Sequence, residues 1–186
     1  MIDVDLGCAL LTLARSAIAE KLGLSRLEAM SHATLEHPSA TFVTLKQAGQ
    51  LRGCVGSLQR RRALRDDVQA NAVAAAFRDP RFAPLEASEL PDTSLEVSLL
   101  SPEERIEAKS EEELITRLRP GIDGVILQYG HHRATLLPQV WQQLHDGHDF
   151  LAALKAKAGL PQDFWSANLI VSRYAVVTWR ESAAAR

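Results

Sequence analysis

The segment from residue 41 to residue 57, TFVTLKQAGQLRGCVGS, constrains the fold more than any other part of this chain. Its first half is rich in β-branched and aromatic residues, and the glycine-containing turn QAGQ separates it from a second extended run. Two such runs around a short turn predict an antiparallel β-hairpin. In the second run, Gly53 and Gly56 flank Cys54 and Val55. Because glycine within a strand often marks a bulge or a close approach of backbone, we expect this hairpin to line a pocket.

The hydrophobic pattern predicts the other elements of secondary structure. Predicted helices cover residues 3–21, 25–35, 64–77, 110–118 and 148–159, with a short helix from residue 138. Predicted strands cover residues 94–100, a second hairpin over 124–138, and one long strand over 169–179. Ser110 and Glu113 have the spacing of a capping box. Hairpins and helices without regular βαβ alternation indicate an α+β fold.

Length and composition limit the class of protein. The 186 residues fit one domain over residues 1–186, with 1–37 as a helical part packed on the sheet. The net charge of -2 argues against a general nucleic-acid binder. Two cysteines, Cys8 and Cys54, fit a reducing compartment. The N-terminus lacks a basic signal region, and no apolar run reaches the length of about 18 residues that a membrane span needs. We therefore expect a cytoplasmic location.

Cys54 is the strongest candidate for chemistry. A thiol between two glycines is accessible to a ligand, and Lys46 and Arg52 across the hairpin could lower its pKa and favour the thiolate. The alternative is a small buried hydrophobic residue, which free cysteines commonly are. Glu96 alternates with apolar neighbours on its predicted strand, so it could act as a general base beside Cys54 or be an ordinary salt-bridged residue.

The segment FRDPRF carries a second set of candidates, Arg78, Asp79 and Arg81. Cations at this helix end suit an anionic ligand. They could equally compensate the helix dipole and pair with carboxylates.

Two further groups of side chains have simpler interpretations. The four histidines at positions 131, 132, 145 and 148 suggest zinc, but no cysteine or carboxylate completes a conventional set, so we expect surface loop histidines and no metal or cofactor. The basic run Arg60, Arg61, Arg62 and Arg65 fits a solvated helix start, with a phosphate or acidic partner as the alternative.

Several motifs together resemble a known family, the AmmeMemoRadiSam system protein A family, or AMMECR domain. The resemblance runs from about Ala40 to Trp179 and is carried by TFVTLK, LRGCVGS, NAVAAAFRDPRFAPL, LEVSLLSP, GVIL followed by RATLLPQVW, and KAGLP-x-x-FW. The departures are minor: valine at position 55 where isoleucine is commoner, leucine at 137, and the histidine pair at 131–132. None involves Cys54.

The resemblance implies an α+β fold in which helices flank an antiparallel sheet and a smaller accessory lobe lies beside it. It implies a Memo-like protein and a radical-SAM protein as partners, and it supplies no reaction. Its signature falls on residues 51–56 and 79–82, and on Arg133, Pro138, Gln139 and Trp141. Together with the residues above, it gives these ligand-binding candidates: Lys46, Arg52, Gly53, Gly56, Arg78, Arg81, Arg133 and Gln139.

Three functions compete at this stage. The first is an enzyme in which Cys54 is the nucleophile and Lys46, Arg52, Glu96 and Arg133 help to bind a small anionic or carbonyl-bearing substrate. The second is a docking module of a multi-component system, in which the hairpin contacts the Memo-like or radical-SAM partner. The third is a nucleic-acid adaptor that uses the basic run over residues 60–65, which the overall charge disfavours.

Overall fold

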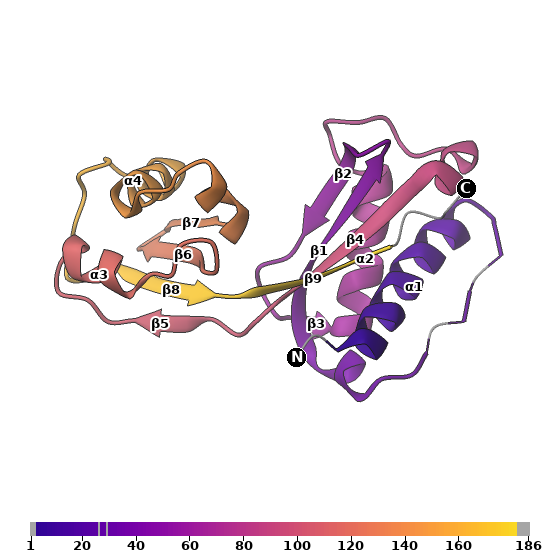
Figure 1. Ribbon diagram of the computed structural model, residues 1–186, viewed down its shortest axis with the longest axis horizontal. Helices are drawn as coiled ribbons and strands as arrows, with labels where there is room; N and C mark the ends of the chain where they lie inside the picture. Colours follow the sequence, from indigo (N-terminus) through magenta and orange to yellow (C-terminus); the bar gives the residue numbers. More distant parts are fainter. Residues whose placement is uncertain (1–2, 26, 29, 182–186) are drawn as a thin grey trace. The chain divides into compact units, whose positions relative to one another are not determined.

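The computed structural model describes residues 3–25, 27–28 and 30–181. The chain forms two compact units (Figure 1). The first unit contains residues 1–100 and 177–186, and the second contains residues 101–176.

A five-stranded antiparallel sheet forms the centre of the first unit. Its strands are β1 (Pro38–Gln47), β2 (Gln50–Gly56), β3 (Arg62–Ala63), β4 (Thr93–Leu100) and β9 (Val176–Arg180). The strand order is β2-β1-β4-β9, with β3 paired to the start of β1. The predicted hairpin is therefore confirmed. Its two-residue turn has positive φ at both Ala48 and Gly49, the geometry of a tight hairpin turn.

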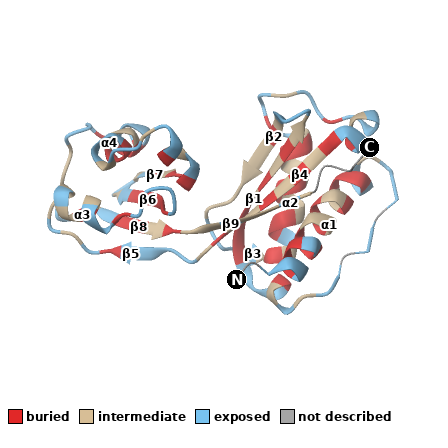
Figure 2. Ribbon diagram, viewed as in Figure 1, coloured by how far each residue is buried: buried red, intermediate tan, exposed pale blue. Residues whose placement is uncertain are grey.

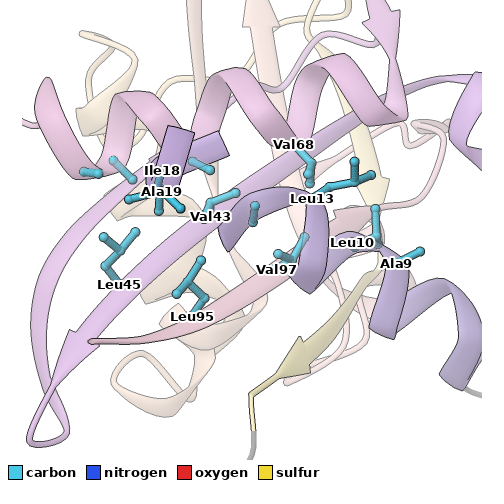
Figure 3. Close-up of a cluster of buried hydrophobic side chains, with 14 of the residues drawn as sticks. Ala9, Leu10, Leu13, Ile18, Ala19, Val43, Leu45, Val68, Leu95 and Val97 are labelled. Atoms are coloured by element: carbon cyan, nitrogen blue, oxygen red, sulfur yellow. The ribbon is translucent and has the colours of Figure 1, made fainter. Parts of the chain in front are cut away.

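Two helices, α1 (Val4–Lys21) and α2 (Leu64–Phe77), cover one face of this sheet (Figure 1). Alternation along the strands sends Val43 and Leu45 of β1, and Leu95 and Val97 of β4, toward the helices. These four side chains are fully buried in a cluster with apolar residues of α1 and α2 (Figure 3). Figure 2 shows buried positions along α1, α2, β1 and β4. The opposite face of the sheet carries the alternate, mainly polar residues.

The second unit contains a four-stranded antiparallel sheet with the order β5-β8-β6-β7. Its elements are β5 (Glu104–Ile106), α3 (Glu111–Arg117), β6 (Gly124–Tyr129), β7 (His132–Leu136), the 3-10 helix η3 (Pro138–Gln142), α4 (Gly147–Lys157) and β8 (Ile170–Tyr174). Trp141 and Phe150 stack with ring centroids 3.9 Å apart in its core. The fold is thus α+β as predicted, with helices packed on antiparallel sheets.

Three predicted elements differ from the structure. The helix predicted over residues 25–35 is wrong for the described residues: only a short 3-10 helix, η1 (Ala33–Glu36), forms, and residues 26 and 29 lie outside the description. The predicted long strand is two strands, because β8 pairs in the second sheet and β9 in the first. The capping box at Ser110 is half formed, since Glu113 accepts from the N–H of Lys109 rather than from that of Ser110.

Contacts with a distant segment of the chain mark the break between β8 and β9. Ser101 donates its backbone N–H to the carbonyl of Ala175 (2.9 Å), and its hydroxyl accepts the Ala175 N–H (3.0 Å). Ala175 is thus held by the segment that leaves β4, and pairing in one sheet ends there. Across residues 3–25, 27–28 and 30–181, no helix combines the length and apolar character needed to cross a bilayer.

Candidate functional site

The register of the first sheet places three candidate side chains in one row. Thr44 of β1 lies opposite Cys54 of β2 on one side and opposite Glu96 of β4 on the other. Directly paired residues point to the same face, so all three lie on the face away from α1 and α2. We call this surface, with Lys46, Ser98, Thr178 and Arg180, the polar sheet face.

The Cys54 thiol contacts a hydroxyl rather than a cation. The Oγ1 of Thr44 donates to the Sγ of Cys54 at 3.3 Å, and the cysteine is half-buried. This hydrogen bond fixes where the sulfur lies on the polar sheet face. Thr44, which sequence analysis did not single out, is therefore the nearest functional neighbour of the thiol.

The predicted base, Glu96, is the centre of an ion cluster. Its Oε1 accepts from the Nζ of Lys46 at 2.7 Å and lies 3.1 Å from the Nε of Arg180. The Glu96 side chain is 16% exposed, whereas that of Arg180 is 68% exposed. Two cations around one carboxylate leave a net positive charge on this part of the polar sheet face.

Glu96 does not adjoin the thiol. Each directly paired residue is about 5 Å from its neighbour, so Glu96 lies roughly 10 Å from Cys54, beyond Thr44. Lys46, expected near Cys54, is bound to Glu96. In the neighbouring row of the same face, where Ser98 lies opposite Phe42, the hydroxyls of Ser98 and Thr178 are 2.8 Å apart.

The backbone of Cys54 is held by a clamp formed by Asp79 and Arg81. The Oδ2 of Asp79 accepts the Cys54 N–H at 2.9 Å, and the Nη2 of Arg81 donates to the Cys54 carbonyl at 3.3 Å. The Asp79 carboxylate also accepts from the Arg81 guanidinium at 2.7 and 2.9 Å. The pKa of the nearly buried Asp79 carboxyl is held well below its usual range. The main cause is the hydrogen bonding from the Arg81 guanidinium, and the Cys54 N–H contributes less.

Arg52 is also bound within the first unit. Its Nε and Nη2 donate to the two carboxylate oxygens of Glu89 at 2.9 and 3.0 Å, and its Nη1 donates to the carbonyl of Ala83 at 2.9 Å. This bidentate contact lowers the pKa of Glu89 to about 2, and the hydrogen bond from the Glu86 N–H is the second largest cause. All three guanidinium nitrogens of Arg52 are thus used to hold β2 to the segment after α2.

The glycines of the LRGCVG motif have internal neighbours. A β-carbon built on Gly53 would lie 2.2 Å from the carbonyl oxygen of Ala75 in α2, and one on Gly56 would lie 2.3 Å from the ring of Phe42. The close approach predicted from these glycines exists, and in both cases the approaching group belongs to the chain itself.

The remaining ligand-binding candidates lie elsewhere. Arg78 caps the end of α2 and lines a shallow groove of about 580 Å³ together with residues of α1 and α2, on the helical side of the sheet. Arg133, which is paired with Glu103 at 3.1 Å, and the exposed Gln139 belong to the second unit. The structure therefore groups Cys54 with Thr44, Lys46, Glu96 and Arg180.

The histidines and the basic run form no cluster of catalytic character. The Nδ1 of His132 lies 2.9 Å from the carbonyl of Ala158, and His145 and His148 are exposed. Over the residues that the structure describes, no set of three or more metal-ligating side chains is arranged to hold an ion. In the basic run, Arg62 binds Asp67 at 2.8 Å and Arg65 pairs with Glu36.

The residues missed by sequence analysis share one origin. Thr44, Ser98 and Thr178 are polar residues that alternate with apolar residues on predicted strands, and Arg180 follows directly after the last predicted strand. Alternation identifies the polar side of each strand, but only the register shows that these polar sides meet.

The fold and site define a class of protein: an α+β chain with two antiparallel sheets and a cysteine on a polar sheet face. The family model for AMMECR1 matches residues 11–179, and the chain belongs to this family. A protein of Methanothermobacter thermautotrophicus is 37% identical over 182 residues, which cover 95% of each chain. A protein of Sulfolobus acidocaldarius is 37% identical over 172 residues, covering 88% of this chain and 76% of the relative.

A solved structure has the same fold. The uncharacterized protein PH0010 from Pyrococcus horikoshii superposes with a TM-score of 0.83 at 33% sequence identity. The match covers 98% of this chain and 94% of that one.

Proposed function

We propose that the polar sheet face binds a small molecule that carries an anionic group, with Cys54 in contact with that molecule. The observation that carries this proposal is the row Cys54, Thr44 and Glu96, which ends at the cations Lys46 and Arg180. An anionic group can take the place of the Glu96 carboxylate in front of these two cations.

The bound molecule would extend from the cations toward the thiol, over the Thr44 hydroxyl. In this arrangement Thr44 keeps the sulfur in place through its 3.3 Å hydrogen bond. If the ligand has a carbonyl group near Cys54, the thiolate can add to the carbonyl carbon while the carbonyl oxygen takes up a proton from solvent. This is the enzymatic form of the proposal.

The system in which the site works follows from the resemblance of the motifs to the AmmeMemoRadiSam system protein A family. We propose that the protein is one component of a system with a Memo-like protein and a radical-SAM protein. The ligand of the polar sheet face would then be handed to, or received from, one of these partners. Co-purification of the three proteins from one host, with and without alkylation of Cys54, tests this part. Absence of any complex in either state would contradict it.

Two alkylating reagents of similar size test the ligand site without a known ligand. Iodoacetate is an anion and iodoacetamide is neutral, so Lys46 and Arg180 should accelerate only the first reagent at Cys54. We expect the rate ratio of iodoacetate to iodoacetamide at Cys54 to exceed that at the exposed Cys8 by about fivefold at low salt. The ratio should fall with added salt or inorganic phosphate.

Variants assign the effect to the cations. Lys46→Met and Arg180→Met should each reduce the Cys54 ratio toward the Cys8 value, while Lys109→Met, an exposed lysine of the second unit, should leave it unchanged. Equal ratios at Cys54 and Cys8 in the unmodified protein would refute anion binding beside the thiol.

A further inference from the structure

We infer that Asp79 and Arg81 are positioning residues for the Cys54 thiol: they fix its backbone and hold one anion and one cation beside it. This inference rests on the proposed function, because it concerns the same thiol. It assigns the DPRF motif a role at the site rather than in ligand contact.

The geometry of the clamp is the first argument. β2 is an edge strand, so the N–H and carbonyl of Cys54 that point away from β1 have no neighbouring strand. Asp79 accepts that N–H and Arg81 donates to that carbonyl, so the two side chains take the place of a paired strand at this one residue. The Cys54 backbone is thereby fixed at both of its free polar groups.

The local sequence explains why both side chains reach the same point. α2 ends at Phe77, and Pro80 cannot continue a helix. The Phe82 N–H donates to the Asp79 carbonyl at 3.1 Å, which closes a turn, and the Asp79 carboxylate also accepts the Arg81 N–H at 3.1 Å. This turn places the carboxylate and the guanidinium side by side against β2.

The charges around the thiol give the second argument. Thr44 contacts it from β1, Lys46 and Glu96 form the ion cluster on β1 and β4, and Arg52 is neutralised by Glu89. Behind β2, α2 presents the carbonyl of Ala75 to Gly53.

The clamp adds two opposite charges that act on the thiol in opposite directions. The pKa of Arg81 is raised, chiefly by its hydrogen bond to Asp79, and the Cys54 thiolate adds to this as a smaller favourable charge. The Asp79 carboxylate repels the same thiolate. In the intact clamp these effects oppose each other, so removing either partner should expose the effect of the other.

The test uses two substitutions with opposite expected signs. Asp79→Asn leaves the cation alone, so the pH midpoint of Cys54 alkylation by iodoacetamide should fall. Arg81→Met leaves the anion alone, so the midpoint should rise. Each shift should be about half a pH unit, the size expected for one unit charge about 6 Å away in water-like surroundings. Arg81→Lys should restore the unmodified midpoint.

Opposite shifts separate an electrostatic role from loss of structure, because local unfolding would expose Cys54 in both variants and shift both rates in the same direction. Cys8 is the internal reference, and Asp163→Asn in the second unit controls for overall charge. If Asp79→Asn fails to fold, Arg81→Met and Arg81→Lys still test the sign. Shifts of the same sign, or none, overturn the inference even where Cys54 prefers iodoacetate. If the two variants shift the midpoint in opposite directions but Cys54 shows no preference for iodoacetate, the role of Asp79 and Arg81 is supported and only the proposed anion site is refuted.

Discussion

Adding one methyl group at Gly53 tests whether the glycine of the LRGC motif serves packing or ligand access. The β-carbon of Gly53→Ala would lie 2.2 Å from the carbonyl oxygen of Ala75, whereas ordinary contact begins at 3.4 Å. β2 and α2 would have to separate by about 1.2 Å. Since the obstacle is backbone rather than a flexible side chain, we expect a loss near the upper end of overpacking costs, about 3 kcal/mol.

Urea unfolding measures this loss. With a slope of roughly 2 kcal/mol per molar urea, the midpoint should fall by about 1.5 M. The matched control is Gly49→Ala at the turn of the same hairpin, where a β-carbon meets nothing within 4 Å but φ is +79°. Strain in the left-handed region alone should cost about 1 kcal/mol.

The comparison of the two variants decides between the explanations. If Gly53→Ala is no more costly than Gly49→Ala, the contact between β2 and α2 is not the reason for glycine at position 53. The close approach of a ligand backbone would then be the better explanation. A large loss with unchanged preference of Cys54 for iodoacetate assigns Gly53 to packing alone.

Two further predictions concern the buried and clamped carboxylates. Asp67 is 1% exposed and accepts hydrogen bonds from the Thr41 N–H and hydroxyl and from Ser57, Arg62 and Asn71. Asp67→Ala should lower the free energy of unfolding in urea by about 3–5 kcal/mol, whereas Thr41→Val should lower it by about 1–2 kcal/mol. Similar losses in the two variants would contradict the role of Asp67 as the acceptor that all these donors share. Because the pKa of Glu89 is lowered to about 2 from 4.5, its stabilisation is full above pH 4.5 and lost as pH falls toward 2. Glu89→Gln should therefore lose less stability between pH 5 and pH 2 than the unmodified protein, and parallel pH profiles would refute the assignment.

The elements whose signals are local could be predicted from the sequence. The hairpin over residues 41–57 was predicted from its change of period and its glycine turn, and the helix over residues 64–77 from its apolar spacing and the proline that follows at position 80. The strand predicted over residues 169–179 was not, since its division at Ala175 depends on pairing with Ser101, far away in the sequence. No local pattern marks a strand that changes sheets.

Cys54, the centre of the candidate site, could be predicted from the sequence, but the residues that contact it could not. The glycines drew attention to Cys54, but Thr44 became its neighbour through hairpin register, in which a bulge lies between Leu45 and Lys46. Arg180 reached Glu96 from the last strand of the chain. Such partners are set by the pairing of distant strands, which composition and periodicity do not predict.

The contacts also separate the parts of the LRGCVG and DPRF motifs that the fold itself explains from the part that it does not. Arg52 is bound to Glu89 and Ala83, Gly53 packs against α2, and Asp79 and Arg81 hold backbone atoms of residue 54. Any residue other than proline at position 54 would satisfy those backbone bonds, so they do not require a thiol. Among residues 3–25, 27–28 and 30–181, the one hydrogen bond that uses the sulfur is donated by Thr44, on the polar sheet face. The choice of cysteine is therefore the feature of the motif that packing leaves to function, and the alkylation experiments are directed at that atom.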